Sequence, residues 1–352
     1  MSVATTVTEI VEPLLRRSLG ELGMVEGNAE AVTLVLPVLA WPTQSDLESA
    51  ISAAVPTATL TVRGMTDAEL TALRNQLRGA MTGTDGVPTF LERNSTTRVL
   101  GISSGKGGVG KSSVTVNVAI ALAQSGATVA ILDADVYGFS IPKMMGGAGE
   151  PVVLGDVVIP TVRHGVRTVS MGYFVDDDQP VLWRGPMLHK AVSQLITETW
   201  WDAPDFLLID MPPGTGDVAL TLSEILPRIE IFVVTTPQPA AQRVAQRSAL
   251  AARTLQLSVR GVIENMSWFI ADDGTRYELF GAGGGDQLAS DLKVALLAQI
   301  PLEPALRAGG DNGAPLMVSD PQSPAGQAFT ALAERIKTQG PARRYAPGLT
   351  VR

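Results

Sequence analysis

A glycine-rich segment with two lysines is the part of this sequence best suited to chemistry. Residues 105–113 read Gly-Lys-Gly-Gly-Val-Gly-Lys-Ser-Ser and contain the pattern G-x-x-x-x-G-K-S. Glycines let successive backbone N–H groups turn inward around phosphate oxygens, and the helix expected after them adds its positive end. We expect Lys111 to pair with the β- and γ-phosphates and the Ser112 hydroxyl to ligate Mg²⁺. The segment predicts a phosphate site rather than an empty turn, because two lysines in one short loop repel unless an anion binds.

Every residue of this loop is a candidate for binding ATP. The residues are Gly105, Lys106, Gly107, Gly108, Val109, Gly110, Lys111, Ser112 and Ser113.

Carboxylates stand at the ends of two apolar runs beyond the loop. Asp133 and Asp135 end one run, and Asp210 ends the run Leu207–Ile209. The carboxyl ends of parallel strands meet at the edge of the sheet where ligands bind. Two carboxylates at Asp133 and Asp135 fit ligation of Mg²⁺ through water, with Asp133 as the expected ligand, and positioning of the attacking water, and we expect Asp210 to hold a Mg²⁺-bound water. A solvated acid pair in a loop is the alternative for Asp133 and Asp135.

The elements that must position these residues alternate between short apolar runs and helical stretches. This pattern predicts an α/β fold, a doubly wound, mostly parallel sheet covered on both faces. The expected strands are 99–103, 128–133, 206–210, 229–235, 259–264 and 294–300, and the helix after the glycine-rich loop is 111–124.

A smaller α+β domain is predicted ahead of this sheet, over residues 1–81. Its expected strands are 31–39, interrupted by Pro37, and 57–62, and its expected helices are 44–54 and 66–81. The second helix opens on the capping box Thr66-Asp67-Ala68-Glu69. Residues 82–97 have no hydrophobic periodicity and indicate a linker, so the larger domain is expected to begin at residue 98. It is expected to end at 339, before a loose tail over 340–352.

Composition narrows the classes of function. The chain has 352 residues, 45% of them hydrophobic, with a net charge of −8 and no cysteine. The negative charge argues against a surface that binds nucleic acid or anionic membrane. The lack of cysteine excludes disulfides and thiolate metal sites within the chain. No apolar run reaches the ~20 residues of a membrane helix, and no signal peptide is visible, so we expect a cytoplasmic protein.

Lys106 is not needed for a generic phosphate loop, and the loop resembles that of the deviant Walker A ATPases. That class includes the nitrogenase iron protein, MinD and ParA. The resemblance implies that Lys106 reaches the nucleotide bound by the other subunit of a homodimer. It also implies that Asp135 orients the lytic water and that Asp217, which ends the loop 211–217, is the switch II acid.

Longer stretches resemble one subfamily, the Mrp proteins, which are iron–sulfur cluster carrier ATPases. The matching stretches are 103–117, 132–146, 183–191, 209–222, 264–269, 281–285 and 300–315, and the segment 19–27 resembles the small N-terminal domain of that subfamily. The resemblance implies ATP hydrolysis in iron–sulfur cluster assembly or transfer, with a scaffold or apo-protein as partner. It also places Asn265 at the adenine, with Pro301 and Arg307 near the base. A turn-forming, structural asparagine is the alternative for Asn265.

The departures from the Mrp pattern concern cluster ligands. Members that carry clusters have a C-x-x-C pair in a position where this chain has Ala271 and its neighbours. Asp272 and Asp273 are hard oxygen donors that suit a cluster poorly, and with Gly274 they predict a tight turn between strands 267–270 and 277–280. In the N-terminal domain, Trp41 stands where a cysteine is usual, and the usual D-P-E becomes a segment that begins at Glu12.

Two further functions are therefore weighed against a cluster carrier. One is an ATP-controlled scaffold that carries no cluster and docks a client. The other is a positioning ATPase like MinD or ParA. A MinD-like function needs a membrane-binding helix, which the proline-containing tail does not favour. A ParA-like function needs a strongly basic face for DNA, and the sequence does not indicate one.

Overall fold

The computed structural model describes residues 3–28, 30–83, 87–92, 94–136, 138–147, 149–173, 185–214 and 216–342, without the side chains of residues 3–5 and 217. The described chain forms two compact units. The first contains Met1–Ser95, Gly149–Val162 and Thr197–Ala203, and the second contains Thr96–Ala148, Arg163–Ile196 and Pro204–Arg352. The sequence placed 149–162 and 197–203 in the larger domain, whereas their contacts group them with the N-terminal residues. Both segments are short, and neither has a composition that marks it off from the chain around it.

The first unit is built on a three-stranded sheet in the order β3-β4-β5. Its elements are α1 (Val3–Thr8), β1 (Val11–Glu12), β2 (Arg17–Ser18), β3 (Val25–Gly27), β4 (Ala31–Leu36), α2 (Gln44–Ala54), β5 (Thr59–Gly64), α3 (Asp67–Met81), the 3₁₀ helix η1 (Thr89–Leu91), β8 (Val152–Leu154) and β9 (Val157–Ile159). Strand β4 ends just before Pro37, as a residue that lacks an N–H requires. The capping box is present, because the Thr66 hydroxyl accepts from the Glu69 N–H and Glu69 accepts from the Thr66 N–H. The predicted linker is partly ordered, since it contains η1 and a bridge between Thr82 and Pro88.

A buried carboxylate joins two of the N-terminal positions that depart from the Mrp pattern. Glu12 is fully buried, and its Oε1 accepts hydrogen bonds from Trp41 Nε1 at 2.9 Å and Thr43 Oγ1 at 2.5 Å. Its other oxygen accepts from the Leu15 N–H at 2.5 Å. A buried carboxylate is tolerated when donors satisfy it in this way. Trp41 therefore belongs to the core of this unit, as its 3% exposure also shows.

The second unit is an eight-stranded sheet in the order β10-β11-β7-β12-β6-β13-β14-β17. Its elements are β6 (Arg98–Ser104), α4 (Lys111–Gln124), β7 (Val129–Asp133), α5 (Ile141–Met144), β10 (Thr161–Arg163), β11 (Val166–Ser170), the 3₁₀ helix η2 (Met171–Tyr173), α6 (Gly185–Thr197), β12 (Phe206–Asp210), α7 (Asp217–Ile225), β13 (Glu230–Thr235), α8 (Pro239–Thr254), β14 (Ser258–Asn265), β15 (Phe269–Ile270), β16 (Arg276–Tyr277), α9 (Gly284–Leu292), β17 (Ala295–Ile300), α10 (Pro304–Asn312), α11 (Leu316–Ser319) and α12 (Pro324–Gln339). The pairings from β11 to β17 are parallel. The predicted α/β fold with a mostly parallel sheet is confirmed.

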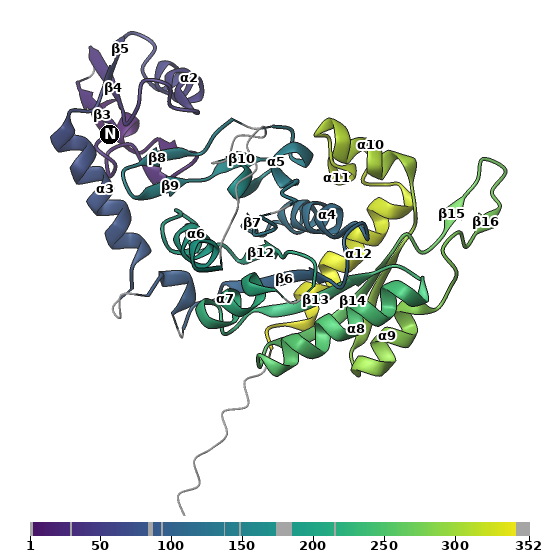
Figure 1. The fold of residues 1–352 in the computed structure, drawn as a ribbon. Coiled ribbons are helices and arrows are strands. Elements are labelled where there is room, and N and C mark those ends of the chain that lie inside the picture. Colours follow the sequence, from purple (N-terminus) through teal and green to yellow (C-terminus); the bar gives the residue numbers. More distant parts are fainter. Residues whose placement is uncertain are drawn as a thin grey trace, which may run out of the picture. The chain divides into compact units, whose positions relative to one another are not determined.

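Helices cover both faces of this sheet, with α4 and α12 on one face and α8 and α9 on the other (Figure 1). Helix α4 is buried on most of its surface, because it packs against the sheet and against α12. Strand β6 lies between β12 and β13, so the loop after it opens beside the ends of both neighbours. Strand β12 pairs in register with β7, which sets Asp210 opposite Asp133. The topology therefore brings the glycine-rich loop and the carboxylates to one edge of the sheet.

The predicted hairpin after β14 is present, but its strands are shorter than the predicted 267–270 and 277–280. Strands β15 and β16 pair antiparallel, with Phe269 opposite Tyr277 and Ile270 opposite Arg276. The turn is closed by the Ala271 N–H to Thr275 carbonyl bond at 2.9 Å, and Gly274 takes a φ of +81° that favours glycine. Ala271, the position where a cysteine would fall, is a residue of this turn.

Candidate nucleotide site

The glycine-rich loop links β6 to α4 as predicted. Gly108 and Gly110 both have a φ of +79°, in the left-handed region where residues with a Cβ are strained. A Cβ on Gly105 would come within 2.2 Å of the Ala245 nitrogen on α8, and one on Gly110 within 2.2 Å of Asn265 Nδ2. These glycines are therefore fixed by the packing of the loop as well as by its conformation.

Three side chains of the loop and helix converge on Asp210, which is fully buried. Lys111 Nζ and Ser112 Oγ each donate to Asp210 Oδ2 at 2.6 Å, and Thr115 Oγ1 donates to Oδ1 at 2.7 Å. The sequence singled out the first two, whereas Thr115 was missed. Its signal is the spacing of four residues from Lys111, which places both on one helix face.

Asp135 lies beside this cluster, with its Oδ2 3.3 Å from Lys111 Nζ. Burial raises the pKa of the Asp135 carboxyl above its ordinary value, and the nearby charge of Asp210 also raises it, while Lys111 opposes the shift. A carboxylate with a raised pKa is a better proton acceptor than an exposed one. This environment is compatible with the water-positioning role predicted for Asp135.

Asp133 has a different set of contacts. Its Oδ1 accepts from the Asp135 N–H at 3.1 Å, and its Oδ2 accepts from Ser170 Oγ at 3.1 Å and from the N–H groups of Ser140 and Ile141 at 3.2 and 3.3 Å. Burial, together with the charge of Asp210, raises its pKa to about 7. These bonds hold the loop that carries Asp135. The metal role stays a prediction for Asp133, and these bonds give it a structural role beside it.

Lys106 is half-buried within its own chain. Its Nζ donates to Gln238 Oε1, just before α8, at a long 3.4 Å. The Ser104 hydroxyl donates to the Lys106 carbonyl at 3.0 Å and fixes the backbone there. Gln238 follows the end of β13 without any motif, so no sequence pattern predicts this contact. Asp217 begins α7, and its side chain lies outside the described part of the structure.

Two adjoining cavities open over the loop. One, of about 720 Å³, is lined by the loop together with Asp135, Pro212 and Pro213. The other, of about 340 Å³, is lined by Asn265, Pro301 and Arg307. Gly110, Ser113 and Met144 line both cavities. The three residues predicted near the base thus meet in one place beside the phosphate loop.

Asn265 is placed to serve the loop and the second cavity together. Its Nδ2 donates to the Val109 carbonyl at 2.9 Å, while its Oδ1 is buried with no hydrogen-bond partner in the described structure. A buried, unpaired acceptor costs free energy until a donor reaches it. The exocyclic amino group of adenine is such a donor. The bond to Val109 gives Asn265 a structural role, and its adenine role stays a prediction.

The donor set fits Mg²⁺ and not an iron–sulfur cluster. Asp135 and Asp210 pair with the Lys111 ammonium, and Asp133 is buried opposite Asp210 in the sheet, so the described site has an excess of hard oxygen donors. No group of three or more His, Cys, Asp and Glu among the described residues is arranged to hold a metal by itself. Mg²⁺ at a phosphate loop needs fewer protein ligands, because phosphates and waters complete its shell. A cluster needs thiolates, and the chain has none.

Comparisons with known proteins agree with this geometry. A family model described as ParA, NUBPL iron-transfer P-loop NTPase, matches residues 95–337. The iron-sulfur cluster carrier protein of Mycobacterium leprae is 40% identical, over 96% of this chain and 92% of that protein. The protein of the same name from Synechocystis is 41% identical, over 95% of this chain and 96% of its own length.

A solved structure of a nucleotide-binding protein has a similar fold. The nucleotide-binding protein from Archaeoglobus fulgidus in complex with ADP aligns with a TM-score of 0.57 and 30% identity, over 66% of this chain and 93% of that one. Among the residues described here, no helix is both long and apolar enough to cross a membrane. The chain therefore belongs to the NUBPL iron-transfer P-loop NTPase family, in agreement with its Mrp resemblance, and is a nucleotide-binding P-loop ATPase.

Proposed function

We propose that this ATPase binds and hydrolyses Mg²⁺–ATP as a homodimer and serves iron–sulfur cluster assembly or transfer, with the cluster held by thiolates of another protein. The observation that carries the ATPase part is the convergence of Lys111, Ser112 and Thr115 on the buried Asp210 beneath the glycine-rich loop. The names of the relatives support the cluster part. The lack of cysteine in this chain assigns the ligands to the client.

Each group has a task in hydrolysis. Backbone N–H groups of the loop and Lys111 bind the β- and γ-phosphates, and Asn265 Oδ1 accepts from the adenine amino group. Asp135 orients a water whose oxygen bonds to the γ-phosphorus as the bond to the β–γ bridging oxygen breaks. Mg²⁺, held by Ser112 and through water by Asp210, would neutralise charge on the phosphate oxygens. Asp133 keeps Asp135 in place through its backbone bonds.

A second candidate is an ATP-controlled scaffold that moves no cluster. The observation in its favour is that Ala271 lies in the turn of an ordinary hairpin, at the position where the Mrp resemblance implies a cysteine in members that carry clusters. Both candidates share the nucleotide chemistry and differ only in the client. An iron-free client would favour the scaffold.

Anaerobic reconstitution with iron and sulfide separates the two. We expect the chain alone to retain no iron after gel filtration. With a thiol-bearing client, we expect cluster delivery that is faster with ATP than with ADP, followed by visible absorption and by iron content of the recovered client. The catalytically impaired variant Asp135→Asn serves as the control. Delivery that is indifferent to the nucleotide and to this variant would refute the carrier function and leave the scaffold.

A further inference from the structure

An apolar groove lies between helices α7 and α8 of the second unit (Figure 1). This α7–α8 groove has a volume of about 340 Å³ and is lined by both helices and by the sheet, with Ser103 of β6 and Ile231 of β13. Leu220 of α7 lines the groove and is 48% exposed, so apolar surface is left open to solvent. None of the residues that we assign to nucleotide or to Mg²⁺ lines it.

The side-chain hydroxyls that line the groove already have hydrogen-bond partners. Ser248 Oγ donates to the Gly214 carbonyl at 3.2 Å and lies 3.4 Å from Ser103 Oγ. Thr254 Oγ1 donates to the Leu250 carbonyl at 3.1 Å. Because these polar groups are satisfied within the chain, the groove favours an apolar side chain over a ligand that needs hydrogen bonds.

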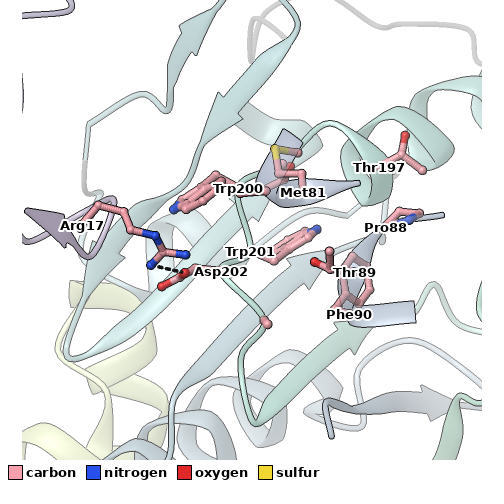
Figure 2. Close-up of a pocket in the computed structure, with 12 residues that line it drawn as sticks. Arg17, Met81, Pro88, Thr89, Phe90, Thr197, Trp200, Trp201 and Asp202 are labelled. Atoms are coloured by element: carbon pink, nitrogen blue, oxygen red, sulfur yellow. Dashed lines mark ion pairs between the residues drawn. The ribbon is translucent and has the colours of Figure 1, made fainter. Parts of the chain in front are cut away.

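The volume of the α7–α8 groove suits large side chains. A cavity of about 150 Å³ can hold benzene, so about 340 Å³ can receive leucine or phenylalanine side chains of a partner. A cavity in the first unit has a volume of about 60 Å³, which is room for only a few waters, and the Arg17–Asp202 ion pair belongs to its lining (Figure 2). Of these two cavities, only the α7–α8 groove can receive a bulky apolar side chain.

Helix α8 adds positive charge to the rim of this groove. Its sequence contains three arginines and no acid, whereas the whole chain has a net charge of −8. Arg243 and Arg247 are both exposed and four residues apart, and Ala251, which lines the groove, follows four residues later. Residues at this spacing lie on one face of a helix. The two arginines therefore form a basic stripe that continues the α8 side of the groove.

The charges of this basic stripe are not neutralised within the described chain. Neither Arg243 nor Arg247 has a hydrogen-bond or ion-pair partner among the described residues. Asp291 on the neighbouring helix α9 accepts instead from Gln246 at 3.3 Å and from Gln287 at 2.8 Å. Positive charge beside an apolar groove is complementary to a partner that presents acids beside a bulky apolar side chain.

Other occupants fit this surface less well. A twofold contact between copies of the chain uses the same patch on both subunits, so the basic stripes would meet and repel each other. Nucleic acid has no apolar side chain to fill the groove, and proteins that bind it use more cations than the two of this stripe.

We propose that the α7–α8 groove and the basic stripe dock an acidic amphipathic helix of another protein. Leucine or phenylalanine on one face of that helix fills the groove, and glutamate or aspartate beside this face pairs with Arg243 and Arg247. The docking surface goes beyond the proposed cluster function and does not depend on it, because it uses no residue of the nucleotide site.

Binding of a synthetic helical peptide to the full-length chain tests the proposal. The probe is a fluorescein-labelled peptide of about 18 residues with leucines at i, i+3, i+4 and i+7 and glutamates on both flanks. Fluorescence anisotropy without nucleotide should give a Kd of roughly 1–100 µM at low salt, and the Kd should rise with salt. One control peptide has lysine for glutamate and another has serine for leucine. Each should bind at least about tenfold more weakly.

Two variants assign the binding to this surface. Arg247→Glu reverses one charge of the basic stripe, and Leu220→Ser removes an exposed apolar side chain from the groove. Each should weaken binding of the acidic peptide at least about fivefold. Arg163→Glu is the matched control, because it reverses an exposed charge on the edge strand β10 and should leave the Kd unchanged. Circular dichroism checks that each variant is folded.

Several outcomes would overturn the proposal. One is an acidic peptide that does not bind up to about 500 µM, or that binds a folded Arg247→Glu protein as tightly as the unmodified chain. Another is binding of duplex DNA that is lost in Arg247→Glu, which would assign the stripe to nucleic acid. A dimer that light scattering detects without nucleotide, and that Arg247→Glu abolishes, would make a second copy the occupant.

Discussion

Lys111 is the cation that the structure places among the buried carboxylates of the nucleotide site. It contacts Asp210 at 2.6 Å and Asp135 at 3.3 Å, and it is only 7% exposed. Asp135 and Asp210 thus share one ammonium group, while Asp133, also buried, accepts from N–H groups and from Ser170. Removing one partner from a buried ion pair costs about 3–5 kcal/mol, because the other charge is left without compensation. Lys111 therefore matters for the site both before and after nucleotide binds.

The variant Lys111→Ala should lose nucleotide affinity. The variant loses charged hydrogen bonds to two phosphates, so we expect its Kd for ATP to be at least about 100-fold higher. Its ATP turnover should fall to background. The matched control is Lys190→Ala, which removes an exposed lysine on α6. Calorimetric titration with ATP measures the affinity, and circular dichroism checks that the variant is folded. Normal affinity in a folded Lys111→Ala protein would contradict the assignment of this loop.

Asn265 offers a test of base selection. Its free Oδ1 accepts from the amino group of adenine, whereas guanine presents a carbonyl oxygen at the equivalent edge. We expect Asn265→Ala to reduce the preference for ATP over GTP by about 10- to 100-fold, the effect of one buried hydrogen bond. Competition between the two nucleotides for a fluorescent analogue measures it. Asn75→Ala is the matched control, because it removes an exposed asparagine on α3 that lines neither cavity. An unchanged preference would leave Asn265 only its bond to Val109.

At the scale of elements, the bounds of helices and strands are predicted best where the periodicity and an end signal occur together. Helix α2 at 44–54, helix α4 at 111–124 and strand β12 at 206–210 have the predicted bounds. Each combines a clear period or apolar run with an evident start or stop. Strands β8 to β11 were not predicted, because they are three to five residues long and their pattern is too short to distinguish from loop. The grouping of 149–162 with the N-terminal residues depends on tertiary contacts alone.

The start of α3 yields a prediction about pH. Hydrogen bonds from Arg63, and then from Thr66, lower the pKa of Glu69 to about 2. Because the folded-state pKa lies below the ordinary value of 4.5, the stabilisation is present above pH 4.5 and is lost as pH falls towards 2. In ¹³C titrations of the carboxyl groups, Glu69 should show no midpoint between pH 6 and 3. In Arg63→Gln, its pKa should rise and a midpoint should enter that range.

Arg78→Gln is the matched control on the same helix, because Arg78 pairs with Asp156 instead of Glu69. It should leave the titration of Glu69 unchanged. A midpoint near 4.5 for Glu69 in the unmodified protein would show that the Arg63 contact does not persist in solution.

At the scale of the whole molecule, the edge of the sheet could be predicted but its side-chain network could not. Parallel topology requires the ends of β6, β7 and β12 to meet, so the motif residues had to gather. The bonds of Asp133 to Ser170 and of Lys106 to Gln238 join residues 37 and 132 positions apart. No local pattern encodes such pairs. The same holds for Glu12 and Trp41, which the sequence marked only as two separate departures.

Lys106 is the residue through which we expect nucleotide binding to control the proposed dimer. Among the described residues, the Lys106 ammonium has only the long bond to Gln238, so little is lost when it moves to a phosphate of the other subunit. A cation supplied across an interface couples neutralisation of the phosphates to association. Lys106→Ala should therefore bind ATP within about threefold of the unmodified affinity, yet fail to dimerise with a non-hydrolysable analogue and lose at least about 10-fold in turnover. Light scattering should report twice the chain mass for the unmodified protein and for Gln238→Ala, which removes only the partner within the chain. A Lys106→Ala protein that dimerises and hydrolyses normally would show that this lysine does not act across the interface.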